Sequence, residues 1–240
     1  MQEIILEDDK MAFRTREAYK TLRSNIEFSG NDIKVIAITS CTPNEGKSEV
    51  SFQLARSFAQ NHKKVLLIDA DMRKSVMRVH FKSGKVHFGL SNYLVKRCQL
   101  SEAICKTDEA GFNMVFSGPV PPNPSELLNN AQFHEMLAKT RDIYDYIIID
   151  TPPLGSVIDS AVISTQCDGA IIVLESGAIS YHFAQKVEDQ LKKADCKILG
   201  CVLNKVELGG GKGYYGKYYG KYYGKYYGKY YGEYYGSDEN

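Results

Sequence analysis

The sequence predicts an α/β fold with a mostly parallel sheet that is covered by helices on both faces. Short apolar runs rich in β-branched residues, such as 33–40 and 145–150, have the character of strands that are buried on both sides. Segments with helical periodicity separate these runs, and strands that alternate with helices form βαβ units with parallel neighbours. The 240 residues, of which 43% are hydrophobic, are sufficient for one large domain of this class with appendages.

The elements are expected in a regular order along the chain. The first is an amphipathic helix over 14–28, with Ala18, Leu22 and Ile26 on its apolar face. Strands are then expected at 33–40, 64–71, 112–118, 145–150, 169–176 and 197–204, and helices at 46–61, from about Ser125, at 158–166 and at 181–194. The stretch between residues 71 and 112 reads as more irregular. We therefore divide the chain into a helical segment (1–30), a large domain (31–207) and a tail (208–240).

Composition and charge exclude several classes of protein. The formal net charge of +1 gives no overall attraction to nucleic acid or to a membrane surface, so no nucleic-acid partner is expected. No apolar run approaches the roughly 20 residues that span a bilayer, and the acidic N-terminus does not resemble a signal peptide. The six cysteines have no zinc-binding spacing, which favours reduced thiols without metal. We expect a cytoplasmic protein.

Residues 41–49, CTPNEGKSE, match a phosphate-binding loop (P-loop) between a predicted strand and a predicted helix. In such a loop the backbone N–H groups and the N-terminus of the following helix face phosphate oxygens. Lys47 is placed to reach the β- and γ-phosphates, and the Ser48 hydroxyl is placed to bind Mg²⁺. The candidate nucleotide-binding residues are Cys41, Thr42, Pro43, Asn44, Glu45, Gly46, Lys47, Ser48 and Glu49.

Cys41 occupies the first position of the motif, where glycine is usual. A small side chain fits there if its φ angle is negative. A thiolate near a helix N-terminus raises the question of redox chemistry; the alternative is a small packing residue.

Three aspartates follow predicted strands. Asp69 and Asp71 end one buried run, and Asp150 ends another. Because ligands of open α/β sheets bind at the carboxyl ends of the strands, these carboxylates should converge on the P-loop. Asp71 and Asp150 are candidate metal ligands together with Ser48, since hard cations prefer oxygen. The alternative is that Asp69 or Asp71 only turns the chain. Asn204, at the end of the last predicted strand, either reads the adenine edge or forms a turn.

The tail is a low-complexity segment of glycine, lysine and tyrosine. Its six Tyr-Tyr pairs are Tyr214, Tyr215, Tyr218, Tyr219, Tyr222, Tyr223, Tyr226, Tyr227, Tyr230, Tyr231, Tyr234 and Tyr235. A glycine in each four-residue repeat disfavours a helix by about 1 kcal/mol each, so we expect a disordered, exposed tail. The chain has ten phenylalanines but none in this segment, which points to chemistry at the phenolic oxygen. The tail has a reach of roughly 30 Å, enough for a neighbouring subunit.

Together these motifs resemble the bacterial tyrosine kinases (BY-kinases) of capsule and exopolysaccharide operons. CTPNEGKSE resembles their Walker A motif, LLIDADMR their Walker A′ motif and IIIDTPP their Walker B motif. EAYKTLR, with Glu17, Lys20 and Arg23, resembles their oligomerisation motif E-x-x-R-x-x-R, and GPVPPNPSELL and the tyrosine cluster also match. The motifs of eukaryotic-type protein kinases are absent from the sequence.

The resemblance implies a MinD-like P-loop fold and transfer of phosphate from ATP, with Mg²⁺, to tyrosine. It implies autophosphorylation of the tail between subunits of a ring, an octamer in the family, and control of polysaccharide synthesis and export. It also implies a membrane-embedded activator that recruits the kinase to the inner face of the membrane, and a phosphotyrosine phosphatase. Lys47, Asp69, Asp71 and Asp150 are then the catalytic residues, and Asp69 is the candidate base, although the two aspartates of this strand end could exchange roles.

Lys20 departs from the family pattern, because lysine does not make the planar bidentate contact of arginine with a carboxylate.

Two alternatives remain at this stage. A positioning ATPase of the MinD/ParA kind would carry a signature lysine where this chain has Thr42, which argues against it. A nucleic-acid-binding ATPase could stack bases on the Lys-Tyr tail. A salt titration with single strands would separate that alternative from a kinase.

Overall fold

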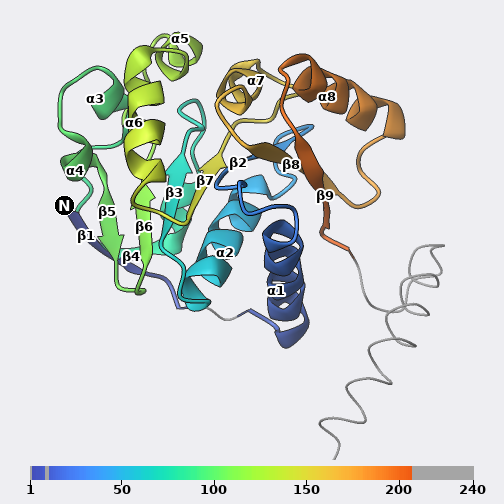
Figure 1. The fold of residues 1–240 in the computed structure, drawn as a ribbon, viewed down its shortest axis with the longest axis horizontal. Helices are drawn as coiled ribbons and strands as arrows, with labels where there is room; N and C mark the ends of the chain where they lie inside the picture. The colour runs from blue at the N-terminus through green and yellow to red at the C-terminus, as the bar shows by residue number, and fades with distance from the viewer. Residues whose placement is uncertain (1, 9–10, 207–240) are drawn as a thin grey trace, which may run out of the picture. The chain divides into compact units, whose positions relative to one another are not determined.

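The central feature of the fold is a nine-stranded sheet within the described part of the chain, in the order β4-β1-β5-β6-β3-β7-β2-β8-β9 (Figure 1). The computed structural model describes residues 2–8 and 11–206, so the predicted tyrosine tail lies outside the described residues. The strands are β1 (Gln2–Leu6), β2 (Val35–Ser40), β3 (Val65–Asp69), β4 (Phe81–Gly84), β5 (Cys105–Thr107), β6 (Phe112–Val115), β7 (Tyr146–Asp150), β8 (Gly169–Glu175) and β9 (Ile198–Asn204). Among these described strands, only the β1–β4 and β5–β6 pairs are antiparallel.

The middle of the sheet is a run of three parallel strands, β3, β7 and β2. Every residue of β2 and β3 is buried, as expected for apolar strands with helices on both faces. In the register, Asp69 of β3 lies opposite Asp150 of β7, and Asp150 lies beside Ile38 of β2. The three strand ends therefore meet at one edge of the sheet.

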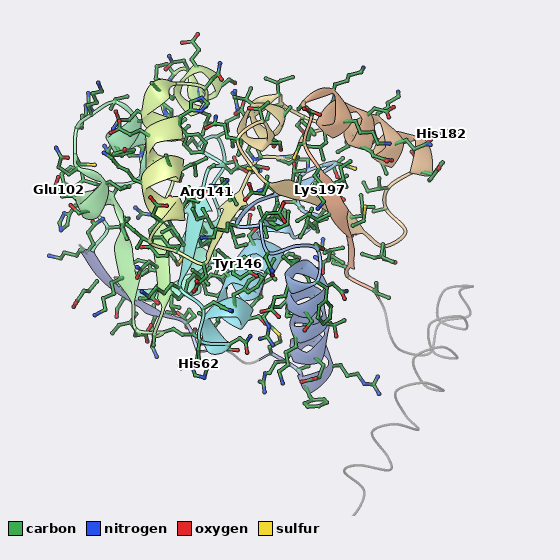
Figure 2. The ribbon with its side chains drawn as sticks, viewed as in Figure 1. His62, Glu102, Arg141, Tyr146, His182 and Lys197 are labelled. Carbon is green, nitrogen blue, oxygen red and sulfur yellow. The ribbon has the colours of Figure 1, made fainter. Side chains whose placement is uncertain are left out.

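Helices cover both faces. They are α1 (Phe13–Glu27), α2 (Lys47–Gln60), α3 (Leu90–Leu94), α4 (Leu100–Ala103), α5 (Pro124–Leu128), α6 (Ala131–Arg141), α7 (Asp159–Ser164) and α8 (Tyr181–Lys193), with a 3₁₀ turn η1 at Met77–His80. On one face, Phe52 and Phe58 of α2 join a core with alternate residues of β2 and β3. Tyr146 of β7, which is labelled in Figure 2, lies at the start of this strand. Its ring stacks on that of Phe58 with centroids 3.9 Å apart. On the other face, α6 packs its Phe133 against β3 and β7.

These observations confirm the predicted α/β fold, and each element expected after residue 30 is present. Three details differ. The helix expected from about Ser125 is two helices, because Asn130 caps α6 by accepting a hydrogen bond from Phe133 N. The stretch read as irregular holds η1, β4, α3, α4 and β5. The segment 1–30 contributes strand β1 as well as helix α1.

The face of α1 that packs on the domain also differs from the expected one. Leu22 and Ile26 pack on the core as expected, but Ala18 is exposed and Tyr19 takes its place. No helix in the described residues is both long enough and apolar enough to span a bilayer.

Candidate active site

The P-loop connects β2 to α2 and is held in shape by one buried carboxylate. Glu45 accepts hydrogen bonds from the backbone N and the hydroxyl of Thr42, and from Glu175 N of β8 at 3.1 Å. Its side chain is 1% exposed, so it bonds within the protein and offers a nucleotide only its backbone N–H. The Glu45 side chain therefore holds the loop in shape, and the expected contact of this residue with a nucleotide, through its backbone N–H, stays a prediction.

Two residues of the loop have left-handed backbone conformations, Asn44 with φ 69° and Gly46 with φ 88°. The left-handed backbone conformation favours glycine at position 46, and a Cβ there would lie 2.2 Å from Asn204 Nδ2 and would displace the Asn204 side chain. Asn204 donates from Nδ2 to Glu45 O at 2.9 Å, which joins the end of β9 to the P-loop. Its predicted role at the adenine stays a prediction.

Cys41 lies at the first position of the loop and has a negative φ angle, which is the condition for a small side chain at this position. Its side chain is fully buried, and burial, with the nearby Glu45 carboxylate, raises the pKa of the thiol to about 12. The thiol is therefore protonated at neutral pH, which favours the packing role over thiolate chemistry.

Lys47 is the centre of the charged cluster. Its Nζ lies 3.1 Å from Asp71 Oδ2, 3.6 Å from Asp150 Oδ2 and 3.1 Å from Ser48 Oγ. Burial alone would lower the pKa of Lys47, but the Asp150 and Asp71 carboxylates outweigh burial and raise it. Burial raises the pKa of Asp150, and the Lys47 ammonium opposes that change. The ammonium group thus compensates carboxylates that would be costly to bury alone.

Asp69 differs from its two neighbours because no cation lies within ion-pair distance of it among the described residues. Its Oδ2 accepts hydrogen bonds from Ser75 Oγ and from Ser117 N, the latter at 3.3 Å. Its Oδ1 is buried without a hydrogen-bond partner. Burial, and then the Asp150 charge, raise the pKa of Asp69 to about 7. A carboxyl group with this pKa is well suited to accept a proton at neutral pH.

The loop after β3 is fixed by a second ion pair. Arg73 donates from Nε to Asp159 Oδ2 at 2.8 Å and from Nη2 to Asp159 Oδ1 at 3.1 Å. Ser125 Oγ also donates to Asp159, whose side chain is 1% exposed. Within the same loop, Asp71 Oδ1 accepts from Lys74 N at 3.0 Å. These contacts join the loop that carries Asp71 to α5 and α7.

The site has an oxygen donor set that suits a small divalent cation. Mg²⁺ is usually held by one or two carboxylates together with substrate phosphates and water. Ser48, Asp71 and Asp150 surround Lys47 Nζ and provide those oxygens. In the described ranges no group of three or more His, Cys, Asp or Glu side chains could hold a metal ion by itself. The geometry therefore fits a cation that is bound with phosphate rather than one bound by protein ligands alone.

Several residues of the site were not predicted from the sequence. Ser51 Oγ donates to Asp150 Oδ1 at 3.1 Å, while Ser75, Ser117 and Asp159 bond to site residues as described above. Ser51 follows the P-loop by one helical turn, so its facing toward the site was predictable in principle. Ser75, Ser117 and Asp159 lie in or next to connecting segments whose paths no sequence pattern indicates.

The predicted oligomerisation residues lie on α1. Glu17 pairs with Lys20 at 2.7 Å, and both side chains are partly exposed. Arg23 instead donates to Ser57 O of α2 at 2.8 Å, within the same chain. Lys20 is exposed, whereas Glu17 and Arg23 are half-buried, and the role of the three residues in oligomerisation stays a prediction.

The fold and the site define a P-loop nucleotide-binding protein that uses a divalent metal. The AAA domain family matches residues 33–198. The chain is 45% identical to "Tyrosine-protein kinase CpsD" of Streptococcus agalactiae over 219 residues, which cover 90% of this chain and 96% of the relative. The kinase domain of the Escherichia coli tyrosine kinase ETK matches with a TM-score of 0.75 at 33% identity, covering 83% of this chain and 80% of that one.

The septum site-determining protein MinD of Pyrococcus horikoshii matches with a TM-score of 0.62 at 24% identity, covering 74% of this chain and 72% of that one, and this likeness concerns the fold alone. The chain belongs to the bacterial tyrosine-protein kinases, P-loop enzymes that transfer a phosphoryl group to protein tyrosine.

Proposed function

We propose that the chain transfers the γ-phosphoryl group of ATP, with Mg²⁺, to the tyrosines of its own C-terminal cluster, and that it does so between subunits. The bond from the γ-phosphorus to the bridging oxygen of ADP breaks, a bond to the phenolic oxygen forms, and the phenol proton passes to Asp69. The observation that supports this assignment is the state of Asp69, which is buried, unpaired at Oδ1 and has a pKa of about 7.

The other charged residues have roles in binding the nucleotide. Lys47 would move away from the Asp71 and Asp150 carboxylates and contact the β- and γ-phosphates. Ser48, Asp71 and Asp150 would hold the metal. When bound, Mg²⁺ neutralises phosphate charge during a transfer that depends mainly on positioning and electrostatics. The backbone N–H groups of residues 41–49 would cradle the phosphates at the N-terminus of α2. Asn204, already bonded to the loop, is the candidate for the adenine contact.

Tyrosine is a suitable acceptor only if its proton is removed, because its pKa is ordinarily about 10. β9 ends at Asn204, which contacts the P-loop, and the tyrosine cluster begins at Tyr214. A segment of this kind, rich in glycine and lysine, can present many phenols to the same kind of site. We assign residues 1–30 to oligomerisation, 31–207 to the kinase domain and 208–240 to the acceptor tail.

We also propose partners, a location and a regulatory role for the kinase in the cell. A membrane-embedded adaptor of polysaccharide export would activate the kinase and recruit it from the cytoplasm to the inner face of the membrane. The kinase would form a ring, an octamer by family resemblance, through α1. A phosphotyrosine phosphatase would reverse the reaction, and the cycle would regulate the synthesis of capsular or extracellular polysaccharide. The resemblance of the motifs to BY-kinases supports these assignments.

The test is incubation of the full chain with ATP and Mg²⁺, with and without the cytoplasmic segment of the adaptor, followed by mass spectrometry of the tail. Lys47→Met removes the phosphate-facing charge and should abolish phosphotyrosine. Lys186→Met, at an exposed position of α8, is the matched control and should leave it unchanged. Phosphotyrosine at native levels in the Lys47→Met chain would overturn the assignment of the P-loop.

A further inference from the structure

A cavity of about 500 Å³ lies beside Asp69 and outside the P-loop. It is bounded by the loop after β3, by residues that precede α3, and by the loop that follows β6. A volume of this size is within the range of ligand sites, about 300–1,000 Å³. None of the roles assigned above to the nucleotide site uses it.

The cavity has a cationic lining. Arg73, Lys74, Arg78 and His87 line it, and no Asp or Glu of the described residues does. Arg73 is paired with Asp159, whereas Lys74 and Arg78 are exposed, and no side-chain ion pair holds either of them within residues 2–8 and 11–206. Two positive charges are therefore available to a ligand at this position.

The cavity also has an apolar part, which includes Met72, Val86 and Phe88. An aromatic ring can pack against such side chains while a phosphate group meets Lys74 and Arg78. A ligand that combines a ring with an anion matches both parts of the lining.

The cavity and the candidate base share two residues. Ser75 and Ser117 line the cavity, and both donate hydrogen bonds to Asp69 Oδ2. Asp69 does not line the cavity itself, and it is connected to the lining through these two contacts of its Oδ2. A peptide seated in the cavity thus lies next to the position at which the phenol proton would be removed.

We propose that this cavity binds a phosphotyrosine of the tail of a second copy of the chain, so that a tail phosphorylated once is retained while another of its tyrosines reaches Asp69. This inference rests on the proposed function, since it requires that the tail is the acceptor. Each phosphotyrosine carries a charge of about −1.5 to −2, which complements the two available cations. The four-residue repeat places successive pairs at most about 14 Å apart, so one pair can be held while the next is presented.

The first test is the binding of synthetic peptides to the full chain, with every tail tyrosine changed to phenylalanine so that the tail does not compete. The peptide GKYYGKYYG is compared with the same peptide carrying one phosphate on tyrosine, and with a peptide that carries phosphoserine at that place. The phosphotyrosine peptide should bind about tenfold more tightly than the unmodified peptide, as expected for charge-assisted hydrogen bonds, and more weakly as salt rises. The phosphoserine peptide should bind less well, because it has no ring.

The variant with Lys74→Gln and Arg78→Gln should lose this preference, whereas Lys186→Gln, which removes one charge from an exposed site on α8, should keep it. Equal affinity for the phosphorylated and unmodified peptides, equal affinity for phosphoserine, or an unchanged preference in the double variant would each overturn the proposal. Because the peptides are phosphorylated by synthesis, this result is independent of whether the chain modifies its own tail.

The second test uses the native tail and intact-mass spectrometry at partial reaction. The native kinase should give unmodified chains and multiply phosphorylated chains with few singly phosphorylated ones. The Lys74→Gln, Arg78→Gln chain should accumulate singly phosphorylated tails first. The same distribution in both would contradict retention, whereas the absence of any tail phosphate in the native chain would contradict the proposed function instead.

Discussion

Replacing Asp69 by asparagine should make the folded chain more stable above neutral pH while it removes transfer to tyrosine. Burial raises the pKa of Asp69 from 3.8 to about 7, so its ionised form is disfavoured in the fold. A group with a raised folded pKa contributes stability that is fully present below its unfolded pKa and is lost as the pH rises through its folded pKa. For Asp69 that loss runs from about pH 4 to about pH 7.

The magnitude follows from the two pKa values. One pKa unit corresponds to about 1.4 kcal/mol, so the ionised carboxylate costs about 4 kcal/mol at pH 8 relative to the unfolded chain. Asparagine does not ionise, and its side-chain oxygen can still accept the hydrogen bonds from Ser75 and Ser117 N. Between pH 5 and pH 8 the native chain should therefore lose about 3 kcal/mol of stability that the variant retains.

The assay is urea unfolding of both chains at pH 5 and pH 8. With a slope of about 1–3 kcal/mol per molar urea, the midpoint of Asp69→Asn should exceed the native midpoint by about 1 M or more at pH 8. The two midpoints should approach each other at pH 5. Asp142→Asn, at an exposed carboxyl, is the control and should show no such difference. Equal midpoints at pH 8 would refute the raised pKa, and native transfer that does not rise with pH through about 7 would refute the role as base.

Three further changes test other parts of the account. Gly46→Ala should weaken the binding of a fluorescent nucleotide, because its Cβ would lie 2.2 Å from Asn204 Nδ2. Gly177→Ala, also at a positive φ but with open space around it, is the control and should not weaken binding. Equal nucleotide affinities of the two variants would contradict the packing argument. Asp159→Asn should lower the unfolding free energy by about 1–3 kcal/mol and slow transfer, because Arg73 loses its bidentate partner. Asp8→Asn, in an exposed pair with Lys82, is the control and should change neither quantity. An unchanged transfer rate in Asp159→Asn would show that the Arg73–Asp159 pair does not act on the site. The tail carries five lysines against three acidic residues, so two phosphorylations reverse its charge and further ones make it strongly acidic, well beyond what Lys74 and Arg78 neutralise. The sedimentation coefficient of the assembly should therefore fall late in the reaction with ATP, once multiply phosphorylated tails accumulate, in the native chain but not with an all-phenylalanine tail. Dissociation of both would place the switch elsewhere.

The central strands were predictable because apolar runs between helices have few alternatives. The run at 145–150 became β7 at Tyr146–Asp150, and the parallel order then brought the ends of β3 and β7 together, as the rule for open sheets requires. Strand β4, with the sequence FKSG, has no apolar pattern and exists through its pairing with β1. Pairing of this kind is a tertiary effect that the local sequence does not predict.

The candidate site also has features that the sequence predicts and features that it does not. The convergence of Asp69, Asp71 and Asp150 follows from topology and was expected. The separate environment of Asp69 was not, because it depends on how the loops carrying Ser75 and Ser117 pack. Arg23 was expected in the oligomerisation motif through the family resemblance, and sequence did not show that its guanidinium reaches the neighbouring α2 and donates a hydrogen bond to Ser57 O of its own chain.

The most direct test of the central claim is to ask which chain receives the phosphate. An isotope-labelled Lys47→Met chain with its native tail is mixed with an unlabelled active chain whose tail tyrosines are all phenylalanine, and ATP and Mg²⁺ are added. We predict phosphotyrosine on the labelled tail in the mixture, and none when either chain is incubated alone. An unmodified labelled tail in the mixture, under conditions in which the native chain phosphorylates itself, would contradict transfer between subunits.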